Sequence, residues 1–361
     1  MLVQKHLFNT PKLDLDIGQS IRATVGYETY GQLSPARDNA ILICHYFSGT
    51  SHAAGRYHPD DAEPGWWDAL VGPGKAFDTN RYFVIAIDTL CNLNVRNPLV
   101  ITTGPATVDL ATGLPYGDQF PQVTIRDNVR LQHQLLASLG IESLVAVAGP
   151  SMGGFQALEW AVTYPHMVGK AIAAVSAPIC PPVFALAYCQ ACMDAIVADP
   201  VNGLVRAARL MTTLARSDTW ITGIWGRKTA AGSAHPWADR EGRFAFQSEM
   251  ETVARQRAQL FDANHFIYTA RACILHDIGY GNRGIEVAAQ KIQAAVLMLP
   301  VTSDLIFAPE ASQSFVELIK SHGGLAEVFP IASPNGHLAA ITEAGRLAEP
   351  IARFLSRGEL H

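Results

Sequence analysis

Short apolar runs recur along the chain, and most are apolar at every position rather than at alternate positions. Strands buried on both faces of a parallel sheet have this pattern. The first run instead shows partial alternation of β-branched and aromatic residues, which also favours a strand. We therefore expect strands at Ile21–Tyr30, Ala40–Cys44, Tyr82–Asp88, Leu144–Ala148, Lys170–Ser176, Ala294–Leu299 and Ala326–Phe329.

Helical patterns separate these runs. Apolar residues recur at Ile125, Val129, Leu135 and Leu139, the spacing of one helix face. We expect helices at Ile125–Leu139, Met152–Tyr164, Pro309–Lys320 and Leu338–Phe354. Strands alternating with helices predict an α/β fold with a mostly parallel sheet.

The alternation stops between residues 178 and 290, where only helical patterns remain. They cover Val183–Ala198, Val201–Ala215, Arg240–Leu260 and Asn264–His276. A helical insertion in such a sheet commonly caps the active site, and it can also form a dimer surface. We therefore expect a core domain of residues 1–177 and 291–361 and a helical cap, or lid, of residues 178–290.

Composition narrows the class of protein. The 361 residues are 49% hydrophobic and 16% charged, with a net charge of −5, which excludes a disordered chain and argues against a nucleic-acid binder. No segment approaches the roughly 20 apolar residues of a membrane span, and residues 1–16 lack the apolar run of a signal peptide. We expect a cytoplasmic protein that acts on a small molecule, with no nucleic acid and no membrane as partner.

The strongest local motif is the G-x-S-x-G sequence Gly149-Pro150-Ser151-Met152-Gly153. It follows an apolar strand and precedes a helix, the context of a nucleophile elbow in the α/β-hydrolase fold. The sharp turn exposes the serine hydroxyl and admits only small neighbours, which explains the glycines. An ordinary glycine-rich turn is the alternative, but the strand before it and the helix after it favour Ser151 as a nucleophile.

A serine nucleophile needs a base, and in this fold the chain order is Ser, then Asp or Glu, then His. Asp304 follows the run 294–299, and His337 follows the run 326–329. We expect Asp304 to orient His337 and His337 to move the proton. The competing residues His265, His276, His322, Asp277 and Glu310 fit this topology less well.

The oxyanion of the tetrahedral intermediate needs two backbone N–H donors. One should be the residue after the nucleophile, Met152, and the other should lie in the loop after an early strand. That loop is His45-Tyr-Phe-Ser-Gly49, and we expect the N–H of Phe47 to be the second donor. This chemistry requires no metal and no cofactor. The C-x-x-C pair of Cys189 and Cys192 lacks partner ligands at metal spacing, so we interpret it as helix packing.

With these residues identified, the chain resembles the homoserine O-acetyltransferase family of α/β-hydrolases. The resemblance is carried by Cys44–Gly49, Gly65–Trp67, Thr103–Pro105, Thr112–Gly117, Val123–Asp127, Ser151–Gly154, Gln156–Ala161, Phe261–Asn264, Ser303–Asp304 and Gly336–His337. It implies the same nucleophile, acid and base that the spacing predicts. It also implies a homodimer, which we expect to form through the helical insertion.

The substrate pocket departs from the family pattern. The resemblance implies an Asp after the catalytic His and a Tyr before the Arg-Ser of the insertion, but this chain has Leu338 and Ala215 there. The family's carboxylate-binding Arg is nearest to Arg209, one position out of alignment. Burying an ammonium without a counter-charge costs several kcal/mol, so Leu338 and Ala215 favour an uncharged alcohol portion.

These departures lead to a functional expectation. We expect a serine carboxylic-ester hydrolase that cleaves small uncharged esters with a short acyl group such as acetate, as in the family's esterase-like branch. The alternative is an O-acyltransferase of the homoserine O-acetyltransferase type that uses acetyl-CoA. A catalytically silent protein that keeps the fold is a third reading, which the complete Ser, His and Asp set disfavours.

Overall fold

The computed structural model describes residues 1–358, and its centre is an eight-stranded sheet in the order β1-β2-β6-β3-β7-β8-β9-β10. The strands from β6 to β10 in this order are mutually parallel, whereas β1 and β2 are antiparallel additions at one edge. The bounds are β1 His6–Asp14, β2 Ser20–Tyr30, β3 Ala40–Cys44, β6 Phe83–Ile87, β7 Ala146–Pro150, β8 Lys170–Ala174, β9 Ala295–Leu299 and β10 Ala326–Val328. A separate pair joins β4 (Val71–Gly72) to β5 (Phe77–Asp78). The mostly parallel sheet expected from the apolar runs is therefore present.

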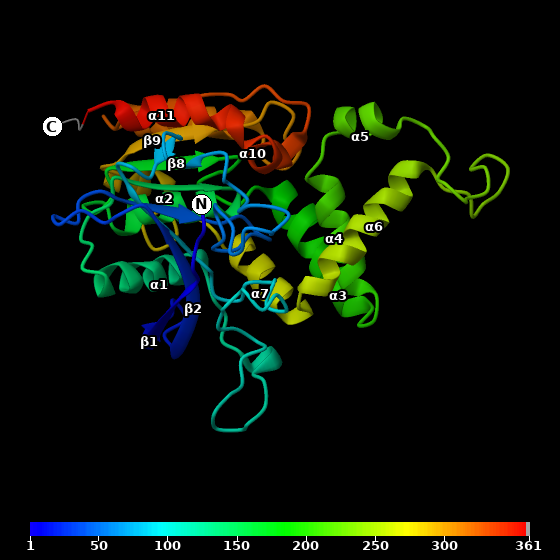
Figure 1. Cartoon of the computed structure of the whole chain (residues 1–361), viewed down its shortest axis with the longest axis horizontal. Helices are drawn as coiled ribbons and strands as arrows, with labels where there is room; N and C mark the ends of the chain where they lie inside the picture. The colour runs from blue at the N-terminus through cyan, green and yellow to red at the C-terminus, as the bar shows by residue number, and fades with distance from the viewer. Residues whose placement is uncertain (359–361) are drawn as a thin grey trace.

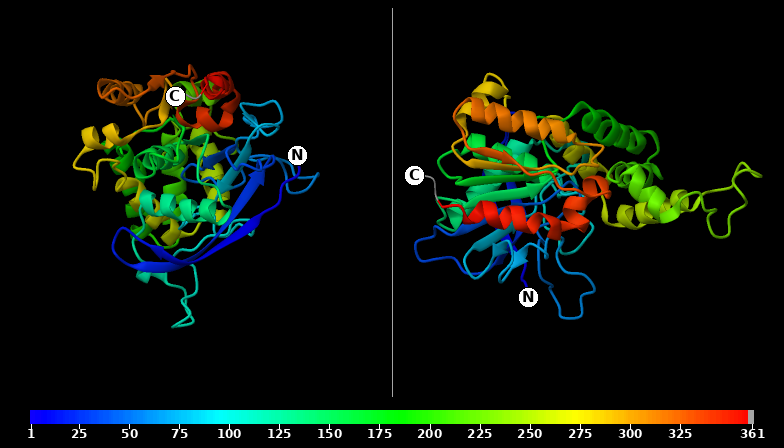
Figure 2. Two further views of the ribbon diagram at one scale, coloured as in Figure 1. Left: turned by 90° about the vertical axis from the view of Figure 1, so that its left-hand side faces the viewer. Right: turned by 90° about the horizontal axis from the view of Figure 1, so that it is seen from above.

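Both faces of the sheet are buried, which explains why its strands are apolar throughout. In β3, Leu42 belongs to the apolar cluster on one face, while Ile41 and Ile43 belong to the cluster on the other. Helices supply the rest of each cluster, as Figures 1 and 2 show. The first face is covered by α1 Ile125–Ser138, α2 Met152–Thr163, α8 Ile285–Lys291 and α9 Pro309–Ser321, and the second by α10 Ala339–Thr342 and α11 Ala348–Ser356.

Between β8 and β9 the chain forms a group of helices at one end of the sheet (Figure 1). It consists of a π-helical segment η2 Phe184–Gln190, then α3 Ala191–Ala198, α4 Gly203–Leu214, α5 Asp218–Trp225, α6 Ala245–Leu260 and α7 Ala263–Ile274. The loop between α5 and α6 projects away from the body (Figure 2, right). A third apolar cluster joins these helices, through Met211 and Phe266, to Phe47 and Met152 of the core. The division into core and cap at residues 178 and 290 stays a prediction. Helix α8 spans residue 290, and its residues Ala288 and Ala289 pack with the core.

Some elements differ from the sequence expectations. The edge strand β1 was not expected. The segment expected as one helix at Leu338–Phe354 is divided: the 3₁₀ turn η3 (Gly336–Leu338) precedes α10, and a second 3₁₀ turn, η4 (Ala344–Leu347), separates α10 from α11. Another 3₁₀ turn, η1, covers Gly117–Gln119. Within residues 1–358, every helix is too short or too polar to cross a membrane.

Candidate active site

Ser151 lies at the sharp turn between β7 and α2. Its backbone has φ 55° and ψ −120°, a left-handed conformation that is strained for a residue with a side chain. The turn fits because its flanking glycines lack a Cβ: at Gly149 or Gly153 that atom would collide with the carbonyl oxygen of Cys44. The G-x-S-x-G sequence therefore forms the strained strand-to-helix turn that the motif predicts.

The structure brings Ser151, His337 and Asp304 together from three separate parts of the chain. Nε2 of His337 lies 2.9 Å from Oγ of Ser151, and Nδ1 of His337 lies 2.8 Å from Oδ2 of Asp304. Asp304 follows β9, and His337 lies in η3 after β10. The arrangement has the hydrogen-bond geometry by which a carboxylate orients an imidazole and the imidazole activates a hydroxyl.

The carboxylate of Asp304 is also fixed by hydrogen bonds to Oδ1, the oxygen that does not face His337. Oδ1 accepts hydrogen bonds from the backbone N–H groups of Ile306, at 2.8 Å, and Phe307, at 3.1 Å. Asp304, His337 and Ser151 are all buried. Because both carboxylate oxygens have defined partners, Oδ2 has one orientation toward the imidazole.

Two backbone N–H groups beside Ser151 are free to bind an oxyanion. Within residues 1–358, neither Phe47 nor Met152 donates its N–H to a protein acceptor, and Met152 is the first residue of α2, where helix N–H groups have no intrahelical partner. These are the two donors expected from the sequence. Their role as an oxyanion hole stays a prediction.

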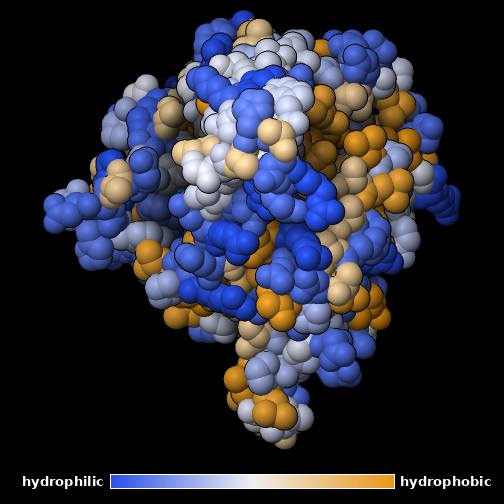
Figure 3. All heavy atoms as spheres, turned by 90° about the vertical axis from the view of Figure 1, so that its right-hand side faces the viewer, coloured by the Kyte–Doolittle hydropathy of each residue, from blue (hydrophilic) through white to orange (hydrophobic). Residues whose placement is uncertain are grey.

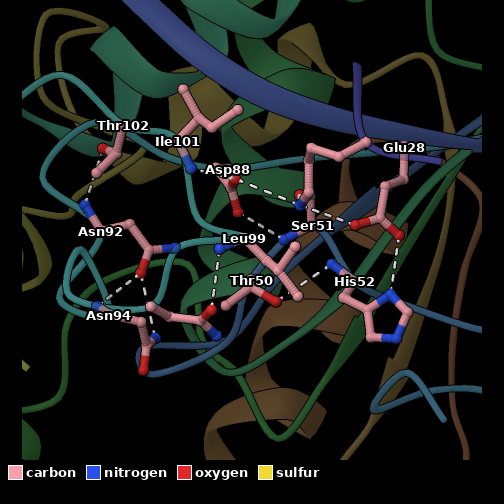
Figure 4. Close-up of polar contacts among 12 residues, drawn as sticks. Glu28, Thr50, Ser51, His52, Asp88, Asn92, Asn94, Leu99, Ile101 and Thr102 are labelled. Carbon is pink, nitrogen blue, oxygen red and sulfur yellow. Dashed lines mark hydrogen bonds and ion pairs between the residues drawn. The ribbon is translucent and has the colours of Figure 1, made fainter. Parts of the chain in front are cut away.

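The loop that carries Phe47 is fixed by asparagines that the sequence did not single out. Nδ2 of Asn92 donates to the carbonyl oxygen of Gly49 at 3.0 Å, and Nδ2 of Asn94 donates to that of Ser48 at 3.1 Å. The backbone N–H of Asn94 donates in turn to Oδ1 of Asn92 at 3.0 Å. Figure 4 shows that these two side chains come from the same short segment of chain. They hold the loop that carries Phe47, and within residues 1–358 neither asparagine has a hydrogen bond to Ser151.

The same loop ends in a buried ionic network (Figure 4). The N–H of Ser51 donates to Oδ1 of Asp88 at 2.7 Å, and Lys5 lies 3.6 Å from Asp88 and 2.8 Å from Glu28. Burial alone would raise the pKa of Glu28, but hydrogen bonds and charge from His52 and Lys5 outweigh it and hold this pKa below its ordinary value. The network therefore keeps charged groups paired beneath the loop.

A narrow pocket opens beside Ser151 and His337. Its wall is mostly apolar and aromatic and consists of Tyr46, Phe47, Ser48, Pro150, Val175, Tyr188, Ala215, Arg257, Leu338 and Ile341. Leu338 and Ala215 both line this pocket, and their role toward a substrate stays a prediction. Arg209, the third residue expected in the pocket, is not among its lining residues: it pairs with Glu251 at 2.9 Å, and its side chain is 46% exposed. On α4 the inward positions are Ala207, Ala208 and Met211, and Arg209 points away from them because each helical residue turns by about 100°.

The competing histidines have other surroundings. Nδ1 of His265 lies 2.9 Å from the carbonyl oxygen of Asn92, and its Nε2 accepts from the N–H of Ala106 at 3.0 Å. His276 stacks on Phe155 with centroids 4.0 Å apart, and burial lowers the pKa of His276 to about 3. His322 contacts Gln290 at the surface. None of these three lies in the pocket of Ser151.

The described residues contain no candidate metal site: within 1–358, no group of three or more His, Cys, Asp or Glu side chains is arranged to hold an ion. Cys189 and Cys192 are buried free thiols. Burial raises the pKa of Cys192 to about 12, so its reactive thiolate form is scarce at neutral pH.

Comparison with known proteins identifies the fold and the relatives of this chain. Residues 39–344 match the family model described as alpha/beta hydrolase fold, which confirms the expected fold class. The homoserine O-acetyltransferase of Symbiobacterium thermophilum is 41% identical and the match covers 96% of this chain and 92% of that protein. The crystal structure of homoserine O-acetyltransferase from Bacillus anthracis is 39% identical with a TM-score of 0.96, covering 100% of this chain and 99% of that one. The crystal structure of esterase E22 is 37% identical with a TM-score of 0.93, and the match covers 98% of this chain and 100% of that one.

These findings correct the expected activity. The leading expectation was an ester hydrolase, but curated relatives at 34–41% identity over more than nine-tenths of the chain are named homoserine O-acetyltransferase. The expectation was wrong for a physical reason: Leu338 and Ala215 bear on whether an ammonium is bound, not on whether water or an alcohol accepts the acyl group. Both outcomes use the same nucleophile and base. On sequence and structure, this chain belongs to the homoserine O-acetyltransferase family of α/β-hydrolases.

Proposed function

We propose that this protein is an O-acyltransferase of the homoserine O-acetyltransferase type, which moves an acetyl group from acetyl-CoA to the hydroxyl of a small acceptor. The observation that carries the proposal is the similarity to acetyltransferases along almost the whole chain, insertion included. The hydrogen-bonded set of Ser151, His337 and Asp304 supports it, because acyl transfer through a covalent intermediate needs such a set.

In the first half of the reaction, Oγ of Ser151 attacks the thioester carbonyl while His337 accepts the hydroxyl proton. The N–H groups of Phe47 and Met152 bind the oxyanion, an interaction whose loss costs about 3 to 4 kcal/mol of transition-state stabilisation per donor. The C–S bond then breaks, and His337 returns the proton to the leaving thiolate. The products are free thiol and acetyl-Ser151.

In the second half, the acceptor hydroxyl attacks the acetyl carbon and gives its proton to His337. The bond between that carbon and Oγ of Ser151 breaks, and His337 returns the proton to Ser151. Asp304 stabilises the imidazolium in both halves. No metal or organic cofactor takes part in either half.

Thiol release tests this proposal. The purified chain is mixed with acetyl-CoA and increasing amounts of small alcohols, and free thiol is measured with a chromogenic disulfide. We expect release to rise with alcohol concentration to saturation, and to be abolished in Ser151→Ala. A rate that is the same with and without every alcohol would refute acyl transfer.

We further propose a cytoplasmic homodimer that associates through the insertion. The insertion exposes large apolar side chains, including Val183, Leu186, Val197 and Val201, and such surfaces commonly mark association sites. Figure 3, which views the insertion end of the molecule, shows hydrophobic patches among hydrophilic ones. Light scattering in solution tests this: a monomer mass at micromolar concentration would contradict it.

A further inference from the structure

One charged side chain in the pocket of Ser151 has no part in the proposed acyl chemistry. Arg257 lies on α6, is half-buried, and lines the pocket together with His337 and Leu338. Its neighbour Arg255, two residues earlier, pairs with Glu251 at 2.7 Å. Within residues 1–358, Arg257 has neither a carboxylate within ion-pair distance nor a hydrogen-bond acceptor. A partly desolvated guanidinium without a partner is energetically unfavourable. The position of Arg257 therefore suits a ligand that carries a negatively charged group.

Other unpartnered polar groups face the same space. Tyr46 and Tyr188 line the pocket, and in the described part of the chain no hydrogen bond involves either hydroxyl. Both hydroxyls can donate a hydrogen bond to an anionic oxygen. Burial raises the pKa of both phenols, with Arg257 acting in the opposite direction, so they are protonated donors at neutral pH.

A second guanidinium adds positive charge nearby. Arg216 stacks over Trp220, 4.0 Å from the ring centroid, and donates to Oδ1 of Asn335. Burial and the positive charge of Arg257 lower the pKa of Arg216 to about 10. Unlike Arg257, Arg216 already has partners.

The pocket offers no carboxylate to a cation. No Asp or Glu is among its lining residues, and the position after His337 is the apolar Leu338. An ammonium bound here would lose its hydration and meet Arg257 without a compensating carboxylate. The electrostatics therefore favour a ligand with a negative group and no positive one.

We propose that Arg257 binds a carboxylate of the acceptor, and that the acceptor is a hydroxy acid without an ammonium group. This inference rests on the proposed acyl transfer and names its acceptor class. Arg257 supplies the two-pronged donor geometry that suits a carboxylate, with Tyr46 and Tyr188 as further donors. The hydroxyl of the acid is then the group that attacks acetyl-Ser151, and the acetyl ester of the hydroxy acid is the product.

Matched acceptors test the preference. We would measure kcat/KM for 4-hydroxybutanoate, homoserine and 1-butanol with acetyl-CoA as donor; the first differs from homoserine only by lacking the ammonium. We expect 4-hydroxybutanoate to be best, and Arg257→Gln to lower its kcat/KM by about 10- to 100-fold, as loss of a charge-assisted hydrogen bond does. In Arg257→Gln, kcat/KM for 1-butanol should change by less than about threefold. The control is Arg255→Gln, a change at a paired surface arginine, which should alter kcat/KM for each of the three acceptors by less than about threefold.

Several results would overturn the proposal. Equal losses for the acid and for 1-butanol in Arg257→Gln would make Arg257 a structural residue. A raised KM for acetyl-CoA with an unchanged KM for 4-hydroxybutanoate would assign Arg257 to the phosphates of the donor. A preference for homoserine over 4-hydroxybutanoate would contradict the acceptor class.

A binding measurement separates this inference from the proposed function. In calorimetry, 4-hydroxybutanoate should bind Ser151→Ala and should bind Ser151→Ala/Arg257→Gln about 10- to 100-fold more weakly. Equal or absent binding to both proteins refutes the carboxylate site. Binding that depends on Arg257, together with thiol release that no alcohol stimulates, refutes acyl transfer and leaves the carboxylate site standing.

Discussion

The ring of Phe307 stacks on the imidazole of His337, with centroids 5.3 Å apart and an interplanar angle of 19°. The backbone N–H of the same Phe307 donates to Asp304 at 3.1 Å. One residue therefore contacts the imidazole and also helps to fix the carboxylate that orients it. Phe307 is not among the residues that line the pocket, so we infer that it positions His337.

Phe307→Leu should slow turnover while keeping the backbone donor. Loss of a stacking contact worth about 0.5 to 1.5 kcal/mol should lower kcat by up to about tenfold, with little change in KM. The matched control is Phe315→Leu, a buried phenylalanine of α9 in the core. Urea unfolding should show a loss of stability in both variants, and a kcat that falls equally in both would argue against positioning of His337.

Asn94→Ala should loosen the loop that carries the N–H of Phe47. Removing the donor to Ser48 costs about 1 kcal/mol, and we expect kcat to fall about fivefold without a matching rise in KM. Asn97→Ala is the control, because Oδ1 of Asn97 accepts only from the nearby N–H of Leu99 in the described structure. Equal kinetics for the two variants would contradict the role of Asn94.

His276 should make stability depend on pH. Its pKa is about 3 in the folded protein because of burial and near 6.5 in the unfolded chain, so below pH 6.5 the unfolded state binds the proton first. Stability is therefore lost as the pH falls, by about 1.4 kcal/mol per pH unit between pH 6.5 and pH 4.5. Urea unfolding at several pH values should show a shallower slope for His276→Phe. Identical slopes in the two proteins would exclude His276 as the source.

Leu338→Asp should change the choice of acceptor. It adds a carboxylate to a pocket that has none and gives an ammonium a partner, so the ratio of kcat/KM for homoserine to that for 4-hydroxybutanoate should rise about tenfold or more. Leu338→Asn is the uncharged control of similar shape. If both variants shift the ratio equally, the effect comes from shape and polarity rather than from charge.

The positions of the nucleophile Ser151 and its two partners could be predicted because each is fixed by a local rule. Ser151 occupies a turn that only glycine neighbours permit, while Asp304 and His337 follow strands whose carboxyl ends meet at one edge of a parallel sheet. The apolar runs likewise located the central strands, since burial on both faces leaves a strong pattern.

Other features depend on tertiary contacts that a single sequence does not display. In β1, most side chains are exposed and Pro11 interrupts the pattern, so this edge strand lacks an apolar signature. Arg209 and Arg257 lie on helices whose sequences do not state which face meets the pocket, and the structure turns the first outward and the second inward. Asn92 and Asn94 carry no motif, because their function is to hold another segment of chain.

The measurement that tests the central claim most directly is the mass of the intact protein during a single turnover. After mixing with acetyl-CoA, we expect one acetyl group on Ser151, none on Ser151→Ala, and rapid loss of that group when a hydroxy-acid acceptor is added, with the acetyl ester as product. An acetyl-Ser151 whose loss is no faster with any alcohol than in buffer alone, and which yields only free acetate, would contradict acyl transfer. Acetylation that persists in Ser151→Ala would contradict the nucleophile itself.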